Sequence, residues 1–182
     1  LRDAGYDTIA LVSKPKAFPV SAHALTGFSE IDTTATPYQL RYQHSAQLKV
    51  SRIIGHLAEP PGADRPPRFV WAHFIEPHYP YTRGPTDEVS PRVGRHEARH
   101  DLAVRYIDEQ LDRLLRFAFA PERRDRTVVI VTSDHGEAFS EHQNSRHGAT
   151  VYEEETHVPL LIFGPGIVAG THRTPVSLVE LL

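Results

Sequence analysis

Apolar residues along this chain follow two kinds of pattern. Short runs of consecutive apolar and β-branched residues, which are typical of buried strands, occur at 8–13, 68–74, 127–132 and 158–163. Apolar residues also recur at helical spacing, at 46, 50, 53, 54 and 57 and again at 107, 111, 114, 115 and 118. We therefore expect one amphipathic helix over 38–57 and a second that ends before Pro121. Strands that alternate with long helices predict an α/β layered fold.

The strand predicted at 127–132 is the clearest element of the chain. Its apolar residues are consecutive rather than alternating, which is typical of a strand covered on both faces. In α/β folds, binding groups gather beyond the carboxyl ends of the strands. Three histidine-bearing segments begin at or just after such ends, so these segments are the first candidates for chemistry.

Composition narrows the classes of protein that fit. The 182 residues are about one domain, with 40% apolar and 24% charged residues, which is typical of a soluble globular protein. The net charge of -3 gives no field that would attract nucleic acid, and we expect no nucleic-acid partner. No cysteine is present, which excludes a disulfide framework and a thiolate metal site.

Both ends of the sequence are typical of longer elements. The first residues resemble the last turn of a helix capped by Gly5, and residues 177–182 resemble the start of another helix. We expect residues 1–182 to be a single partial domain, truncated at both ends. The chain contains no apolar run of 18 residues and no leader-like segment. A signal or membrane anchor would then lie in missing segments.

The strongest chemical signal is Asp134 followed by His135, directly after the strand at 127–132. A carboxylate and an imidazole on one turn can both point into the same cleft, and Gly136 allows a backbone conformation that a side chain would forbid. Hard oxygen and borderline nitrogen ligands suit Zn²⁺ or Mn²⁺ and tolerate other divalent ions. An ordinary polar surface turn is the alternative, which the preceding buried strand disfavours.

Further histidines lie in the predicted loops. His147 belongs to an Arg-His-Gly segment after Asp134, and His78 follows the strand at 68–74, where binding groups tend to lie. The alternative for His147 is a solvent-exposed loop residue. His73 falls inside the strand pattern and is expected to be structural. The same is expected of the histidines that belong to no motif, namely His23, His44, His56, His96, His100 and His172.

Two ligands do not hold a catalytic metal, because such sites usually have three protein ligands and an open position. The sequence offers no obvious third ligand, and it contains no phosphate-binding loop, nucleophile elbow or zinc-protease motif. Glu137 follows the pair and is expected either to orient His135 or to be an exposed carboxylate. The sequence therefore predicts half of a metal site.

Several segments match one known pattern. The strand at 127–132 leads into Ser-Asp-His-Gly-Glu, and Arg-His-Gly, Tyr-Glu-Glu, His-Val-Pro-Leu-Leu-Ile and Gly-Pro-Gly follow before residue 167. This stretch resembles the C-terminal half of the catalytic domain of the sulfatase family, within the alkaline phosphatase superfamily. Residues 69–81, which include His-Phe-Ile-Glu-Pro-His-Tyr-Pro-Tyr, are similar to that family's strand and active-site loop. The resemblance is weakest over 14–67.

The resemblance implies an alkaline-phosphatase-like fold, with a mixed, mostly parallel sheet sandwiched between helices. It implies hydrolysis of a small-molecule or glycan sulfate ester, with Asp134 and His135 as metal ligands. His78 would contact the sulfate and protonate the leaving oxygen, and His147 would contact the anion. The implied cofactor is a divalent metal ion, expected to be calcium as in sulfatases, with zinc or manganese as in related transferases.

Two departures from the family pattern keep alternatives open. His147 stands where many sulfatases have a lysine, which also resembles the phosphoethanolamine and phosphoglycerol transferases of the superfamily, so the substrate could be a phosphodiester. No Cys/Ser-x-Pro-x-Arg nucleophile segment is present. We expect that segment and its Asp-Asp pair upstream of Leu1, and this chain alone to be inactive. A non-catalytic binding module is the remaining alternative, and a periplasmic, extracellular or membrane-anchored parent is compatible with the resemblance.

Overall fold

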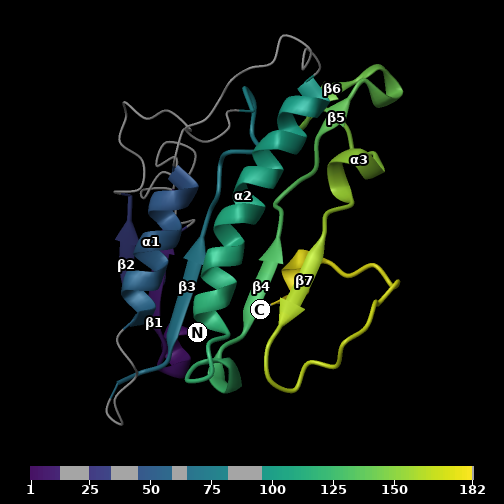
Figure 1. Cartoon of the computed structure of the whole chain (residues 1–182). Coiled ribbons are helices and arrows are strands. Elements are labelled where there is room, and N and C mark those ends of the chain that lie inside the picture. Colours follow the sequence, from purple (N-terminus) through teal and green to yellow (C-terminus); the bar gives the residue numbers. More distant parts are fainter. Residues whose placement is uncertain (13–24, 34–44, 59–64, 82–95, 182) are drawn as a thin grey trace.

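The computed structural model describes residues 1–12, 25–33, 45–58, 65–81 and 96–181. These residues form sheets with helices packed against them (Figure 1), so the predicted α/β class is confirmed. The main elements are β1 (Asp7–Leu11), β2 (Glu30–Asp32), α1 (Ser45–Ala58), β3 (Arg68–Ala72), α2 (His96–Ala118), β4 (Val129–Thr132) and β7 (Leu160–Phe163). Three short elements complete the site region: β5 (Ala138–Phe139), β6 (Ser145–Arg146) and α3 (Glu153–Thr156).

The described strands form one parallel sheet and two antiparallel pairs. β1 lies at the centre of a three-stranded sheet in the order β2-β1-β3, and it pairs in parallel with both neighbours, Ile9 lying opposite Glu30 and Val70. β4 pairs with β7 in the antiparallel direction, Thr132 lying opposite Leu160. The arrows of β1 to β4 point the same way in Figure 1. The carboxyl ends of β3 and β4 therefore lie at the same end of the molecule.

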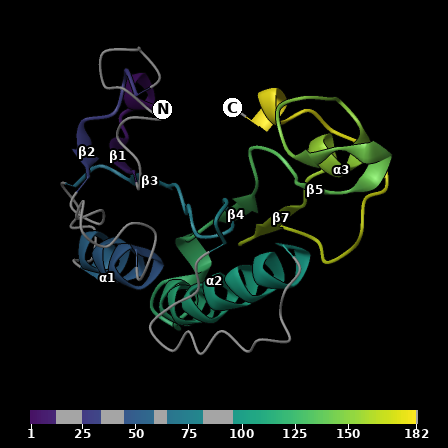
Figure 2. The same ribbon diagram turned by 90° about the horizontal axis from the view of Figure 1, so that it is seen from above.

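Both long helices lie on one side of the strands, as the view from above shows (Figure 2). The core between them and the sheet contains Ile9, Leu11 and Ile53, with Leu114 of α2 packed against it. A second core cluster, on the other face of β1, contains Ala10, Val12 and Leu25 with Phe28, Ile31 and Trp71 packed around it. β1 is thus buried on both faces, as its apolar run predicts.

The element boundaries follow the sequence pattern closely. Gly5 has φ 85° and closes a 3-10 turn over Arg2–Ala4, which confirms it as a helix cap. α2 begins at His96, well before the first apolar position of the predicted helix. Residues 177–182, predicted as a helix start, contain a 3-10 turn over Leu178–Leu181. Residues 38–44 of the first predicted helix lie outside the described residues.

The predicted covering of β4 on both faces is wrong for the described residues. Alternate side chains are exposed, Val128 by 57% and Ile130 by 48%, while Val129 and Val131 are half-buried. Figure 2 shows the reason, since α2 lies against one face of β4 and β7 pairs with its edge. Consecutive apolar residues identified the strand correctly but did not identify what covers it.

A buried ionic group joins the start of α1 to the end of β3. Lys49 and Glu76 are both 0% exposed. Glu76 accepts hydrogen bonds from Ser45 Oγ at 2.8 Å, from the Ala46 amide and from the Ile75 amide at 3.1 Å. Lys49 Nζ donates to the backbone carbonyl of His73. These contacts fix the segment that leads from β3 to His78.

Lys49 predicts a pH dependence of stability. Burial lowers its pKa to about 8, although Glu76 and Asp32 oppose the shift. Between pH 8 and the ordinary pKa of 10.5, the unfolded chain keeps a proton that the folded chain has released, so stability rises with pH over this window. We expect urea unfolding to show this rise in the native chain and to lose it in Lys49→Met. A native stability that stays level over the window would contradict the prediction.

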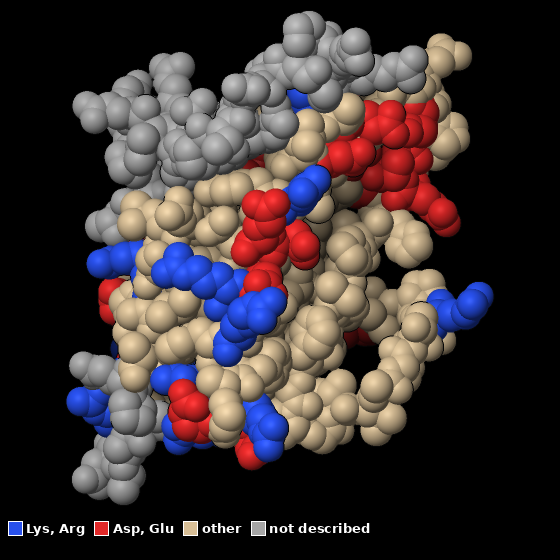
Figure 3. Space-filling model, in the orientation of Figure 1, with Lys and Arg blue, Asp and Glu red and all other residues tan. Residues whose placement is uncertain are grey.

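The outer face of α2 is covered by charges of both signs, as the space-filling view shows (Figure 3). Arg105 pairs with Glu109 at 3.4 Å and Arg116 with Asp112 at 2.7 Å, both at i,i+4 spacing. Such pairs support an exposed helix surface. Among the described residues, no helix is both long enough and apolar enough to cross a membrane.

Candidate active site

Three loops bring their imidazoles together at the carboxyl ends of β3 and β4. His78 lies in the turns after β3, His135 directly follows β4, and His147 follows β6. The ring centroids of His78 and His147 are 5.3 Å apart, edge to face. Those of His147 and His135 are 3.7 Å apart, with the rings stacked. The rings of His78, His147 and His135 thus form one row of imidazoles, although His78 and His135 are 57 positions apart in the sequence.

Each ring in the row is held through the same nitrogen. Nδ1 of His78 lies 2.7 Å from the carbonyl oxygen of Tyr79, and Nδ1 of His135 lies 2.7 Å from that of Gly136. Because a carbonyl only accepts, Nδ1 carries the proton in both rings. The lone pair is then on Nε2. This tautomer is the one in which a histidine can ligate a metal or accept a proton through Nε2.

Glu137 connects the row of imidazoles to Tyr81. Its side chain is 6% exposed, and its carboxylate accepts a hydrogen bond from His147 Nδ1 at 2.9 Å and another from the Tyr81 hydroxyl at 2.9 Å. Burial and this bond raise the pKa of Tyr81, so the phenol remains a donor. The expectation that Glu137 orients His135 or is exposed is therefore wrong, because its carboxylate is buried against His147 instead.

Asp134 and His135 lie as a pair that fits one metal ion. Asp134 Oδ1 accepts from the His135 amide at 3.1 Å and lies 3.8 Å from His135 Nε2. Two ligands each about 2.1 Å from a tetrahedral ion are separated by about 3.4 Å, so a small side-chain rotation suffices. No group of three or more metal-ligating side chains is assembled within the described parts of the chain. The geometry thus agrees with a pair of ligands rather than a complete site.

His73 directly follows β3 and is half-buried. Its amide continues the ladder from β3 to Leu11 at 3.0 Å. Burial and the neighbouring positive charge of Lys49 lower its pKa to about 4, and the Asp134 carboxylate opposes this shift. A neutral imidazole close to His78 and His135 agrees with the structural role expected from its place in the strand pattern.

Gly136 is needed for close packing rather than for an unusual φ. It is not among the glycines with positive φ, which corrects the sequence-based expectation. A Cβ at this position would lie 2.1 Å from the carbonyl oxygen of Glu154 and 3.0 Å from its carbonyl carbon. The turn that carries Asp134 and His135 therefore packs directly on the backbone of α3, and only glycine permits this distance.

Glu155 holds two loops of the site together. Its side chain is buried, and its carboxylate accepts from Asn144 Nδ2 at 2.7 Å, the Gly148 amide at 2.7 Å and the Thr150 hydroxyl. Its own carbonyl accepts from the Gly136 amide at 2.8 Å. These hydrogen bonds lower the pKa of Glu155. The loop that carries His147 and the turn that carries His135 are thus fixed to the same residue.

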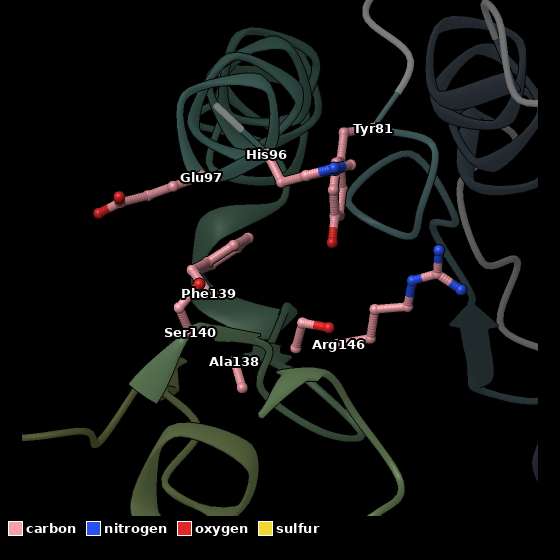
Figure 4. A pocket seen from close by; sticks show the side chains of 8 residues that line it. Tyr81, His96, Glu97, Ala138, Phe139, Ser140 and Arg146 are labelled. Atoms are coloured by element: carbon pink, nitrogen blue, oxygen red, sulfur yellow. The ribbon is translucent and has the colours of Figure 1, made fainter. Parts of the chain in front are cut away.

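A pocket lies beside the row of imidazoles. Its volume is about 590 Å³, and it is lined by Tyr81, His96, Glu97, Ala138, Phe139, Ser140, Ser145 and Arg146. In Figure 4 the Tyr81 hydroxyl and the Phe139 ring are directed toward its centre, while Glu97 and Arg146 lie on opposite sides. Tyr81 therefore links the two, because it lines the pocket and also donates to Glu137, whereas His78, His135 and His147 are not among the lining residues.

The four residues that the sequence proposes for the site lie near one another in the structure, but the residues that position them were missed. Tyr81, Glu137 and Glu155 each lie inside a segment that carries the family resemblance. Their hydrogen-bond partners are not sequence neighbours, however: the Glu137 carboxylate binds His147, 10 residues away, and Tyr81, 56 residues away. Among the remaining histidines, His142 stacks on Tyr152 at 3.8 Å and contacts Glu154. It lies outside the row of imidazoles.

The fold and this site define a class before any relative is considered: an α/β domain with an Asp-His pair directly after β4 and further histidines beside it. Solved structures of the alkaline phosphatase superfamily share the fold. One is a member of that superfamily from Vibrio parahaemolyticus, with TM-score 0.58, 20% identity and coverage of 91% of this chain and 40% of that chain. Their low identity shows the fold alone.

The model of the sulfatase family matches residues 1–182, and the chain belongs to the sulfatase family. It is 40% identical over 77 residues to the uncharacterized sulfatase YidJ of Escherichia coli, covering 42% of this chain and 15% of YidJ. It is 32% identical over 118 residues to human arylsulfatase K, covering 61% of this chain and 22% of that protein. The chain thus spans about a fifth or less of the length of these relatives.

Two further structures extend the comparison of folds. The C-terminal periplasmic domain of EptC from Escherichia coli has TM-score 0.63 and 16% identity, with coverage of 91% of this chain and 50% of that chain. The lipoteichoic acid synthase LtaP of Listeria monocytogenes has TM-score 0.59 and 12% identity, with coverage of 91% and 45%. The fold of this chain therefore occurs in proteins of more than one described activity.

Proposed function

We propose that this chain forms part of the active site of a metal-dependent hydrolase of sulfate esters. The observation that carries the proposal is the row of imidazoles beside Asp134, in which His135 presents Nε2 and His78 and His147 flank it. Membership of the sulfatase family and the name of arylsulfatase K agree with a sulfate ester as substrate. A small-molecule or glycan ester fits the open pocket beside the row.

Asp134 and His135 are the residues that would hold the metal. A divalent ion bound there supplies positive charge that stabilises an oxyanion and activates a nucleophile. His135 suits this role because its Nδ1–H is donated to a carbonyl, which fixes the ring. The His147 ring stacks on His135 with 3.7 Å between the ring centroids, which further restricts the orientation of the ligating ring.

His78 and His147 would contact the anionic group of the ester. An imidazole can donate a hydrogen bond to a sulfate oxygen or protonate the leaving oxygen near neutral pH. The carboxylate of Glu137 accepts from His147 Nδ1 and holds the ring in place, which leaves Nε2 for contact with the anion. His147 is therefore the better candidate for binding the anion, and His78 for transferring the proton.

A phosphodiester transferase or hydrolase of the same superfamily is the second candidate. The observation in its favour is that a histidine, His147, and not a lysine lies beside the metal pair. The fold shared with a lipoteichoic acid synthase is compatible with such chemistry. Turnover by the intact protein of a phenyl sulfate and of the corresponding phosphodiester, compared at equal concentration, separates the two candidates.

The first test of the proposal is a metal titration of the chain by calorimetry. We expect the native chain to bind the metal ion weakly. Asp134→Ala should lower the affinity about tenfold or more, because His135 is then the one proposed ligand that remains. Asp125→Ala is the matched control, since Asp125 is an exposed carboxylate in the 3-10 turn that precedes β4, whereas Asp134 follows β4. Equal affinity in Asp134→Ala and the native chain would overturn the assignment.

The same titration identifies the metal. Family resemblance favours calcium, whereas a histidine ligand is more typical of zinc or manganese than of calcium, which takes oxygen ligands. Where both ions bind, we expect His135→Ala to lower the affinity for Ca²⁺ less than the affinity for Zn²⁺. Zn²⁺ binding that His135→Ala leaves unchanged would exclude His135 as a ligand.

A further inference from the structure

A short hairpin with a strained turn lies between Glu137 and His147. Its two strands are β5 and β6, and residues 140–144 connect them. We propose that His142 is a positioning residue of the site, which fastens this hairpin to α3 and so keeps His147 against Glu137. The inference rests on the proposed function, because His142 would act through His147.

The hairpin is too short to keep its shape alone. β5 and β6 have two residues each, and an isolated two-stranded hairpin is marginally stable in water. Glu137 directly precedes β5, and His147 directly follows β6. Their hydrogen bond at 2.9 Å therefore joins the two residues at the open end of the hairpin. If the hairpin opened, the carboxylate and the imidazole would separate.

The backbone of the hairpin is strained in and beside its turn. Ser140, His142 and Gln143 have φ values of 107°, 48° and 58°, and Arg146 at the end of β6 has φ 75°. A side chain makes left-handed backbone costly, and such conformations persist only where surrounding contacts enforce them. The hairpin thus needs contacts outside itself.

These contacts come from α3 and from its N-cap residue, Tyr152, which lie next to β5 and β6 (Figure 1). His142 Nδ1 donates to Glu154 Oε1 at 2.8 Å, and this bond lowers the pKa of Glu154. The His142 ring stacks on Tyr152, with 3.8 Å between the centroids and 10° between the planes. Asn144 Nδ2 adds a hydrogen bond to Glu155 at 2.7 Å.

α3 is a suitable support because the metal pair's turn is fixed to it as well. The Gly136 amide donates to the Glu155 carbonyl at 2.8 Å, and Gly136 packs on the backbone of α3. The same short helix thus holds the turn that carries His135 and the hairpin that leads to His147. His142 thereby sets the position of one imidazole relative to the other.

The test substitution is His142→Gly, which removes both side-chain contacts and relieves the left-handed strain. The His142 side chain is 53% exposed, so its removal leaves no buried cavity, and we expect no fall in Tm. Long-range ¹H–¹⁵N spectra of the chain should show the fixed Nδ1–H of His147 replaced by a mixture of tautomers. In the intact protein kcat should fall about tenfold, with nearly unchanged metal affinity.

Two further variants separate the contacts of His142 from its backbone. His142→Asn should restore part of the native His147 spectrum, because asparagine tolerates left-handed backbone and its Nδ2 takes the place of the imidazole Nδ1. Gln143→Gly is the matched control, since Gln143 is exposed with φ 58°, and it should leave His147 unchanged. A fixed His147 tautomer in His142→Gly, an equal loss in Gln143→Gly, or no recovery in His142→Asn would overturn the proposal.

Failure of this inference and failure of the proposed function give different results. Metal binding that depends on Asp134, together with a fixed His147 tautomer in His142→Gly, overturns the role of His142 alone. Loss of the fixed tautomer in His142→Gly, together with metal affinity unaffected by Asp134→Ala, supports the role of His142 and overturns the metal site on which the proposed function depends.

Discussion

Gly136→Ala should destabilise the chain by about 3 kcal/mol, the upper part of the range for an overpacked interior. The added Cβ would lie 2.1 Å from a backbone oxygen of Glu154, and backbone cannot rotate away as a side chain can. The turn must then separate from α3, which breaks the hydrogen bond from the Gly136 amide to Glu155. For a chain of this size we expect Tm to fall by about 10 °C, measured by circular dichroism.

Gly55→Ala is the matched control for this substitution. Gly55 lies within α1, and nothing lies within 4 Å of a Cβ built there. Alanine favours helix over glycine by about 0.5–1 kcal/mol, so Gly55→Ala should raise Tm slightly. A Gly136→Ala chain as stable as the native one would show that the turn and α3 are not in the contact described.

Loss of the close contact should also disturb the site. Because Glu155 binds both the Gly136 amide and the loop around His147, displacement of the turn moves His135 relative to His147. We expect metal affinity in Gly136→Ala to fall even at temperatures where the chain remains folded. Unchanged metal affinity in the folded variant would separate the packing role of Gly136 from the site.

Glu137→Gln should lower the turnover of the intact protein by about 10- to 100-fold, the usual effect of removing a group that orients a site histidine. The amide keeps the size of the side chain but removes the negative charge that His147 and Tyr81 share. His147 then loses the carboxylate that fixes the orientation of its ring. The fall should appear mainly in kcat, with metal affinity nearly unchanged because Glu137 is not a proposed ligand.

A second measurement checks the role of Glu137 without turnover. Long-range ¹H–¹⁵N spectra report which ring nitrogen of His147 carries a proton, and we expect the fixed Nδ1–H of the native chain to become a mixture in Glu137→Gln. Glu122→Gln, at an exposed carboxylate next to Arg123, is the control. A large loss of metal affinity in Glu137→Gln would instead make this carboxylate a ligand.

Local sequence patterns were enough to find most elements and to propose site residues that lie close together in the structure. Runs of apolar residues identified β1, β3, β4 and β7 because consecutive apolar and β-branched side chains favour a strand, although β4 and β7 keep exposed side chains in the described residues. Helical spacing identified α1 and α2 for the same kind of reason. Asp134 and His135 were found because they lie directly after a strand, and His78 because prolines end the strand before it.

Other features depend on residues that are distant in the sequence, and only the tertiary structure decided them. Glu137 was predicted to serve its neighbour His135, but packing of the β5 and β6 segments against the loop of Tyr81 brings it to His147 instead. The reason for Gly136 could not be found locally either, since the atom it must avoid belongs to Glu154.

The sequence by itself therefore determined the fold class, the family and the types of residue available for chemistry. These depend on the periodicity of side chains and on short motifs, which are local properties of the chain. The tertiary structure decided which carboxylate holds which imidazole, which face of β4 is covered and where a pocket opens. Those outcomes depend on distances between separate loops, which are set by the packing of α2, α3 and the strands around them.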